Sequence, residues 1–516
     1  MAILVGGVSP TACARPTLPA DTAVIASGAD LEDIAPVLAV HPLTRQVHRH
    51  LLYVTLVRND AQLGIVPYAA RAWRWSADGR AVTLELEPTL AWHDGTPTTA
   101  HDVAFTLRAA ATPATGSPRA AELGLISSVT VDGPHVLTLR FAAARTTLPQ
   151  VLAELPIMPS HRWTAIDPAT WRTVDASAAS TGNGPMRLAR RRRGEHWVFE
   201  RNPAFPRALG GPTALARVIV AVVDEPTTKL AGLVSGTLHM AGVSPTMASL
   251  VARDSTLVLA SPPVLFSTVL VMNATRAPFD DPRVRRALSR ALHRQRLVDG
   301  ALAGFGSGAG SAVPPGVLPG PVPAPLESVA EANALLDAAG WRRGADDMRQ
   351  RNGTPLAVDL WTVGSGDLAI EQLVQGDLEA VGVRVRLRAQ EFTALLAALR
   401  APAQERAFDL ALTGVPGDVA LGHLEALLHS RGAGGALDLG RVHDATLDTL
   451  IDRARAQRIA DARDAWRAVD ARLDTIMPVV WLYHARGVQG LSRRLEGVTL
   501  DLRGELATVA QWRVAR

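Results

Sequence analysis

Cysteine and lysine are almost missing from this chain. Cys13 is the only cysteine among 516 residues, so the chain forms no intramolecular disulfide and no zinc cluster built from several thiolates. Lys229 is the only lysine; the other basic residues are arginines, which raise the pI without implying a basic surface. The 53 basic and 49 acidic residues nearly balance and are interspersed. This composition argues against nucleic acid as a partner.

Long apolar runs are also missing. No stretch of about 18 apolar residues could cross a bilayer. The most apolar segment, residues 257–274, is interrupted by Pro262 and Pro263 and is rich in β-branched residues, which predicts two strands that meet at a bend. Apolar residues nevertheless make up 47% of the chain, enough for sizeable cores. A chain of this length exceeds what one core supports, so we expect two or three domains.

The sequence also lacks the common catalytic motifs. It has no G-x-S-x-G elbow, no phosphate-binding G-x-x-x-x-G-K loop and no H-E-x-x-H. The glycine-rich segment 304–312 follows a predicted helix, whereas a phosphate-binding loop follows a strand and opens a helix. The sequence therefore predicts a protein that is not an enzyme and needs no cofactor.

Three His-Asp pairs are the remaining candidates for chemistry: His93-Asp94, His101-Asp102 and His443-Asp444. Such pairs occur in metal-dependent hydrolases, and that class is retained as an alternative function. Backbone geometry offers another explanation. Asp94 precedes a glycine in a turn, Thr99 suits a helix N-cap, and Asp102 stands where a capping box returns the interaction. We expect no metal site in this segment.

The first residues have features of an export signal. Residues 2–8 are apolar, and two small residues precede Cys13, as at a bacterial lipoprotein cleavage site. The run is short and has no basic residue ahead of it. Two interpretations of residues 1–19 therefore stay open: a truncated export or lipoprotein signal region with Cys13 as its lipidation site, or an ordinary frayed N-terminus.

The order of strands and helices changes along the chain. Residues 81–88 and 135–142 alternate with period two, as strands do. Arginines 190–193 precede Gly194 between two alternating stretches, which predicts an exposed hairpin tip. Asp281 suits an N-cap for a helix that should run to about Gly300 or Gly304. A capping box from Ser328 to Glu331 opens the next helix, which should end at Gly340.

Residues 355–413 alternate strand, helix, strand, helix and strand, which indicates an α/β layer with parallel strands. In such sheets ligands bind beyond the carboxyl ends of the strands. The loop after the last strand is predicted to hold residues 414–418. Asp418 is therefore the acidic residue that the topology directs toward a ligand, although a helix N-cap would also explain it.

Several segments in order resemble one known family. The stretch VPYAARAWRWSADGRAVTLELEPTLAWHDGTPTTAHDVAFTL is similar to the signature region of the family 5 extracellular solute-binding proteins, the peptide and nickel binders of ABC importers. Further similar segments follow in the expected order at residues 182–205, 233–243, 272–302, 331–341, 408–414 and 477–485. The resemblance covers residues 20–512, nearly the whole chain.

The resemblance implies an α/β fold of two lobes that close on a ligand, a periplasmic-binding-protein-like clamshell of type II, class C, with an extra small domain inserted in lobe one. Lobe one would comprise residues 20–47, 158–265 and 482–516. The inserted domain would comprise residues 48–157, and lobe two residues 266–481. Pro262 and Pro263 lie near the implied hinge.

The resemblance also implies candidate ligand contacts. Asp418 matches an aspartate that receives the peptide amino group in peptide-binding members, but Val415 stands where these members have a tryptophan. Phe266 and Ser267 match a segment that contacts ligand. The implied function is binding of a peptide or peptide-like solute outside the cytoplasm and its delivery to the permease subunits of an ABC transporter, by a monomer. Nickel, oligosaccharide and opine cargoes stay open, as does a peptide-holding chaperone or signalling receptor on the same scaffold.

Overall fold

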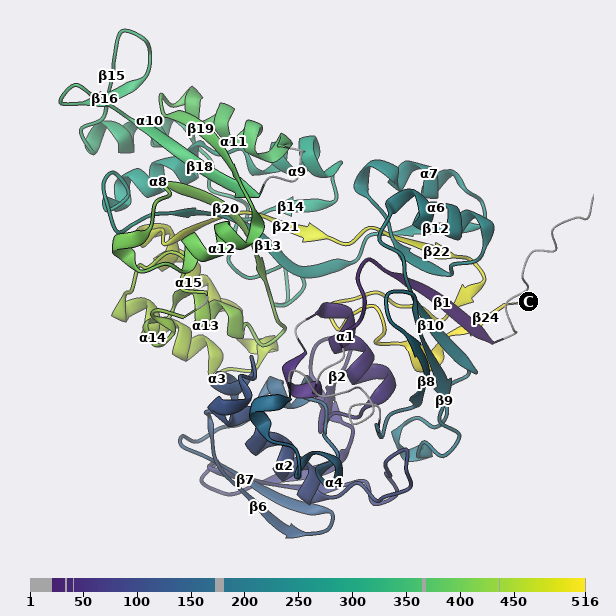
Figure 1. Ribbon diagram of the computed structural model, residues 1–516. Helices are drawn as coiled ribbons and strands as arrows, with labels where there is room; N and C mark the ends of the chain where they lie inside the picture. Colours follow the sequence, from purple (N-terminus) through teal and green to yellow (C-terminus); the bar gives the residue numbers. More distant parts are fainter. Residues whose placement is uncertain are drawn as a thin grey trace, which may run out of the picture.

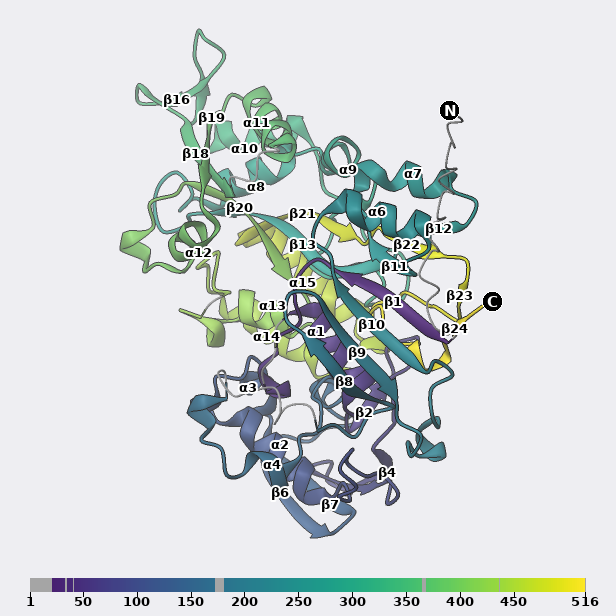
Figure 2. The same ribbon diagram turned by 45° about the vertical axis from the view of Figure 1, so that its right-hand side comes forward.

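The structure is a computed structural model that describes residues 21–32, 35–39, 41–171, 181–363, 368–435 and 437–515. Cys13 and the predicted signal region lie outside the described residues. Three sheets organise the chain into a lobe one with a seven-stranded sheet, a lobe two with a six-stranded sheet, and an inserted domain with a four-stranded sheet. Figures 1 and 2 show the two lobes side by side, with the inserted domain at the foot of lobe one and near lobe two.

Lobe one has the strand order β12-β22-β11-β1-β10-β9-β8. Strands β1, β10 and β11 run parallel to each other, so their carboxyl ends share one edge. The strands are β1 (Thr22–Ser27), β8 (Met186–Arg192), β9 (His196–Arg201), β10 (Arg217–Val222), β11 (Met240–Gly242), β12 (Leu257–Ala260) and β22 (Gln489–Ser492), with helices α1 (Pro42–Val47), α6 (Pro226–Ser235) and α7 (Ala248–Arg253). The predicted arginine hairpin is confirmed: β8 and β9 pair antiparallel around Gly194, whose φ is 71°.

The inserted domain is an antiparallel sheet with helices packed on it. Its elements are β4 (Ala70–Trp75), β5 (Ala81–Leu86), α2 (Ala100–Ala111), α3 (Ala120–Leu123), β6 (Ile126–Gly133) and β7 (Val136–Phe141). A two-stranded ribbon, β2 (Val57–Asn59) and β3 (Ile65–Pro67), and the short helix α4 (Ser160–Trp163) flank it. The alternation predicted for residues 81–88 and 135–142 is confirmed by β5 and β7, which pair with each other.

Lobe two has the strand order β14-β21-β13-β20-β18-β19. Its strands are β13 (Pro263–Met272), β14 (Gly306–Gly308), β18 (Ala357–Val363), β19 (Arg384–Gln390), β20 (Leu410–Pro416) and β21 (Val479–Arg486). Its helices are α8 (Pro282–Ala291), α9 (Arg294–Leu302), α10 (Val329–Ala338), α11 (Ala369–Ala380), α12 (Phe392–Arg400), α13 (Gly422–Leu428), α14 (Ala445–Arg455) and α15 (Arg463–Ile476). Strand β18 runs parallel to both β19 and β20, which confirms the predicted parallel layer.

The helix predicted from Asp281 to Gly300 is wrong in its length. Asp281 does cap it, accepting a hydrogen bond from the Arg283 amide at 2.8 Å. However, α8 ends at Ala291, and a second helix, α9, begins at Arg294 after His293. The carboxylate of Asp377 on α11 accepts the His293 amide at 2.9 Å and also lies 3.0 Å from Nδ1 of its ring. A tertiary contact thus replaces the intrahelical bond that would have continued α8.

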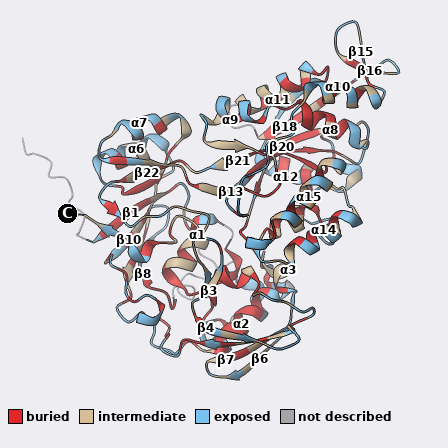
Figure 3. Cartoon of the chain, turned by 180° about the vertical axis from the view of Figure 1, so that it is seen from behind, coloured by how far each residue is buried: buried red, intermediate tan, exposed pale blue. Residues whose placement is uncertain are grey.

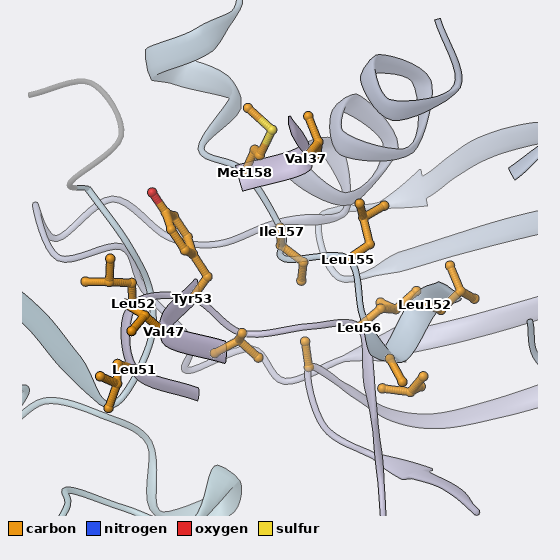
Figure 4. Close-up of a cluster of buried hydrophobic side chains, with 14 of the residues drawn as sticks. Val37, Val47, Leu51, Leu52, Tyr53, Leu56, Leu152, Leu155, Ile157 and Met158 are labelled. Atoms are coloured by element: carbon orange, nitrogen blue, oxygen red, sulfur yellow. The ribbon is translucent and has the colours of Figure 1, made fainter. Parts of the chain in front are cut away.

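Buried apolar side chains show which parts form one packed body. One cluster joins lobe one to the inserted domain; Figure 4 shows part of it, where Val47, Leu51 and Leu52 lie beside Tyr53. Lobe two has two clusters of its own, one on each face of its sheet. Figure 3 shows these buried residues along the sheets and the inner helix faces. Lobe one and the inserted domain therefore share a core, and lobe two is packed separately.

The chain passes between the two lobes at two places, and these two segments lie side by side. The bend predicted at Pro262 is confirmed, because β12 ends before it in one sheet and β13 begins after it in the other. The second crossing follows β21. The Gly487 amide donates to the Pro262 carbonyl at 2.9 Å, and Arg486 Nε donates to Ser261 Oγ at 3.1 Å. These bonds tie the crossings into a single narrow connection, which suits a hinge. The exact domain boundaries stay a prediction.

Candidate ligand-binding site

Asp418 lies two residues beyond β20, at the carboxyl edge of the parallel strands of lobe two. The strand runs to Pro416, so the loop is shorter than predicted. Asp418 is 8% exposed. Its carboxylate accepts hydrogen bonds from the amides of Gly422 at 3.0 Å and His423 at 2.8 Å, at the start of α13. Asp418 therefore lies at the predicted strand edge. Leu421 is the N-cap residue of α13, and the Asp418 carboxylate accepts from the first two amides of that helix.

The charge on Asp418 is stabilised from several sides. Nδ1 of the His423 ring lies 3.1 Å from its carboxylate. Burial alone would raise its pKa. The hydrogen bond and charge of His423, the charge of Arg119 and the Gly422 amide outweigh burial and hold the pKa of Asp418 well below its ordinary value. Asp418 is therefore an anion throughout the neutral range.

Arg119 comes from the inserted domain, just before α3. Its Nη1 donates to Glu122 at 2.9 Å and its Nη2 to Glu154 at 2.5 Å. Glu154 also pairs with Arg45 and, at 3.7 Å, with Arg49. The Arg119 guanidinium thus donates to two carboxylates, and its charge also lowers the pKa of Asp418 in lobe two. The inserted domain and lobe two meet at this polar junction.

Glu122 lies opposite Asp418 at this junction. A β-carbon placed on Gly422 would be 3.5 Å from the carboxyl carbon of Glu122 and 3.6 Å from each carboxylate oxygen of Asp418. Burial raises the pKa of Glu122 to about 7; the charges of Asp418 and Glu154 add to this effect, and Arg119 opposes it. At neutral pH the junction therefore holds one ionised and one partly protonated carboxyl group.

Phe266 stands on β13 beside the end of β20, where it pairs with Pro416. Its side chain is large and apolar, yet the residue is 42% exposed. The ring lies over Gly414: a β-carbon there would come within 2.1 Å of the ring's Cζ. Gly414 thus makes room for an exposed aromatic ring at the same strand edge as Asp418.

Ser267 points to the other face of β13, because successive residues of a strand alternate. It is 3% exposed, and its hydroxyl lies 2.8 Å from Nδ1 of His484 on β21. The other ring nitrogen of His484 lies 3.1 Å from the Ser311 carbonyl. The Ser267 hydroxyl is therefore engaged inside lobe two, and its predicted contact with ligand stays untested.

The first two His-Asp pairs have structural roles. The Thr99 amide donates to Asp102 at 2.8 Å, which confirms the predicted capping box of α2. Asp94 pairs with Arg162 at 3.1 Å, and its carboxylate lies 2.9 Å from Nε2 of His161. In the part of the chain that the structure describes, no three His, Cys, Asp or Glu side chains group as a metal ion requires.

The strand order predicted the position of Asp418, and the family resemblance implied Phe266, but neither indicated Arg119, Glu122 or His423. His423 had a local signal, since it follows Asp418 at the start of a helix. Arg119 and Glu122 had none, because nearly 300 residues separate them from Asp418 and no periodic pattern relates the two segments.

The sequence profile described as bacterial extracellular solute-binding proteins, family 5 middle, matches residues 64–434. The chain belongs to the family 5 bacterial extracellular solute-binding proteins. This family 5 protein is 27% identical to Protein XP55 of Streptomyces lividans over 97% of its own length and 92% of the relative's. It is 27% identical to the nickel-binding periplasmic protein of Escherichia coli K12 over 68% of each chain.

A solved structure shows the same fold. The oligopeptide-binding protein AppA of Bacillus subtilis, solved with a nonapeptide, superposes with a TM-score of 0.77 at 20% identity, covering 96% of this chain and 99% of that one. The predicted two-lobed α/β clamshell with an inserted domain is confirmed for this family 5 protein. Members of the family bind solutes for transport. In the described residues, no helix is long and apolar enough to span a membrane.

Proposed function

We propose that this protein is the extracytoplasmic substrate-binding protein of an ABC importer, and that it binds a peptide or peptide-like solute between its lobes for delivery to the permease. Asp418 carries the proposal. It is an anion at the carboxyl edge of the lobe-two strands, and a cargo ammonium group has the charge and the donors that such a carboxylate accepts. The relative solved with a nonapeptide supports a peptide cargo.

The proposed mechanism uses binding energy to change the population of two arrangements. Lobe two has its own cores and a narrow connection to the rest, so it can move as a body. A cargo that contacts Asp418 on lobe two and groups on lobe one stabilises the closed arrangement over the open one. The permease then recognises the closed form. Cargo with equal affinity for both arrangements would not signal.

Phe266 is proposed to contact an apolar part of the cargo, since its exposed ring shares the strand edge with Asp418. We also propose that the protein acts as a monomer and that Cys13, which lies outside the described residues, carries a lipid anchor. Nickel chelates, oligosaccharides and opines are the other cargo classes that a screen must include.

Thermal unfolding with a library of peptides, sugars and metal chelates tests the proposal. A cargo present at about 100 times its Kd should add roughly 2.7 kcal/mol to the free energy of unfolding. Asp418→Asn should abolish this gain. The matched control is Asp281→Asn, which alters another capping aspartate of lobe two, at the start of α8, and should leave the gain unchanged. Stabilisation by sugars or chelates alone would contradict the peptide cargo.

A further inference from the structure

The junction between the inserted domain and lobe two is built around two carboxyl groups from separately packed bodies. Glu122 belongs to α3, whose domain shares its core with lobe one, whereas Asp418 belongs to lobe two. Both approach the same point above Gly422 within 3.6 Å. When the bodies separate, this proximity ends and Glu122 no longer faces the charge of Asp418, whereas Asp418 keeps its bonds to Gly422 and His423 within lobe two. The charge state of the pair and the closure of the junction are therefore coupled.

Positive charge at the junction is already divided among several acids. Arg119 serves both Glu122 and Glu154, while Arg45 and Arg49 pair with Glu154. On the lobe-two side, His423 pairs with Asp418. One turn further along α13, Glu425 pairs with Arg431 at 3.1 Å and also with Arg455. An ionised Glu122 would share the guanidinium of Arg119 with Glu154 while facing the charge of Asp418.

A second pair across the junction also opposes closure. The charge of Arg455 on α14 acts on Arg145 of the inserted domain, and burial together with this like charge lowers the pKa of Arg145. The closed junction thus brings like charges together twice, two carboxyl groups at one place and two guanidinium groups at the other, while Arg119 and Asp418 attract each other across it. Only the carboxyl pair can relieve its repulsion by binding a proton near neutral pH.

We infer that Glu122 and Asp418 form a proton-controlled latch, in which the inserted domain closes on lobe two when Glu122 carries a proton and is released when Glu122 ionises. The inference rests on the proposed function only in this respect: the latch covers Asp418, the proposed cargo-binding group, while the protein is empty. A proton on Glu122 lets Asp418 keep its charge without repelling the inserted domain. Loss of that proton favours the open arrangement, in which cargo can reach Asp418.

The raised pKa of Glu122 supports this geometry and sets the size of the expected effect. If closure moves the pKa of Glu122 from its ordinary value of 4.5 to about 7, the ratio of closed to open molecules should fall roughly 30-fold between pH 5.5 and pH 8.5. Asp418 stays ionised throughout this range, so it contributes no change of its own.

Distance measurements between two spin labels on the empty protein test the latch without any cargo. Labels at Ser128→Cys in β6 and Asp464→Cys in α15, both exposed positions, report on the separation of the inserted domain and lobe two in a Cys13→Ser background. The short distance should dominate at pH 5.5, and a longer one should gain population at pH 8.5. Glu122→Gln, which resembles the protonated acid, should keep the short distance at both pH values.

Glu85→Gln is the matched control, because Glu85 is an exposed acid of the same domain, paired with Arg71 at 3.4 Å. In the Glu85→Gln variant, the distance between the labels should change with pH as it does in the parent. A parent distribution unchanged between pH 5.5 and pH 8.5 would overturn the latch, and so would a Glu122→Gln variant that responds like the parent. The comparison of the labelled parent at the two pH values needs neither Glu122→Gln nor Glu85→Gln to fold. Since no cargo is present, either result leaves the proposed function to be judged by the cargo screen.

Discussion

Glu122 and Asp418 converge on the first residue of α13 from two separately packed bodies of the molecule. Each carboxyl group comes within 3.6 Å of the position that a side chain at Gly422 would occupy. Two buried carboxyl groups so close cannot both ionise without cost. The pKa of Glu122 is raised although Arg119 pairs with it, so Glu122 holds a proton unless a further cation joins the two groups. A peptide ammonium would be such a cation. The proposed cargo and the proton on Glu122 are then alternatives at one place.

Cargo binding should release a proton below neutral pH. At pH 6 most of Glu122 is protonated in the closed, empty protein, and an ammonium group at the junction should displace that proton. Calorimetry of a peptide that binds, repeated in buffers with different ionisation enthalpies, should report nearly one proton released per peptide at pH 6. Glu122→Gln should release none. An enthalpy that does not depend on the buffer in the parent protein would contradict the exchange.

The stability of the empty protein should carry the signature of Glu122. Its folded pKa is raised, so its contribution is fully present below about pH 4.5 and is lost as pH rises through about 7. The free energy of unfolding of the parent minus that of Glu122→Gln should therefore fall by at most about 3 kcal/mol between pH 4.5 and 8. Denaturant unfolding at several pH values measures this difference.

Buried histidines change the free energy of unfolding in the opposite direction with pH, so the parent is compared with Glu122→Gln at each pH. Burial lowers the pKa of His48, His239 and His484 to about 4 each, so protonating them costs stability as pH falls below about 6.5. The parent and Glu122→Gln share this loss, so it cancels in the difference between their free energies of unfolding. A difference that stays flat from pH 4.5 to 8 would show that Glu122 titrates normally in the folded protein.

Gly414→Ala should displace the ring of Phe266. The new methyl group would meet the ring at 2.1 Å, and the ring can swing toward solvent because Phe266 is 42% exposed. We expect a loss of stability below about 1 kcal/mol and a loss of cargo affinity equal to that of Phe266→Ala. Isothermal titration of both variants checks this. Unchanged affinity in both would remove Phe266 from the proposed site.

Ser267→Ala should act on stability and not on cargo. Removing the hydroxyl leaves Nδ1 of the buried His484 without its partner, which costs about 1–3 kcal/mol. Thermal unfolding should show the loss, while the Kd of a bound peptide should change less than twofold. A tenfold weaker Kd at unchanged Tm would instead make Ser267 a ligand contact, as the family resemblance implies.

The elements that depend on local chemistry could be predicted from the sequence. The capping box at Thr99, the bend at Pro262 and the parallel layer that places Asp418 at a strand edge all follow from short patterns. Alternation along β13 could also have shown that Phe266 and Ser267 face opposite sides. The break at His293 could not be predicted, because the group that causes it, Asp377, lies on another helix. The role of Glu122 could not be predicted for the same reason, because Asp418 lies nearly 300 residues away in the sequence.

We propose that Asp418 receives the positively charged amino group of a peptide cargo. Isothermal titration of the tightest-binding peptide, first with a free and then with an acetylated amino terminus, measures whether that amino group is needed. Acetylation removes the charge and with it the ammonium partner of Asp418 in the cargo, so the Kd should rise at least about 100-fold. Equal affinity for the free and the acetylated peptide would show that Asp418 does not receive the amino group.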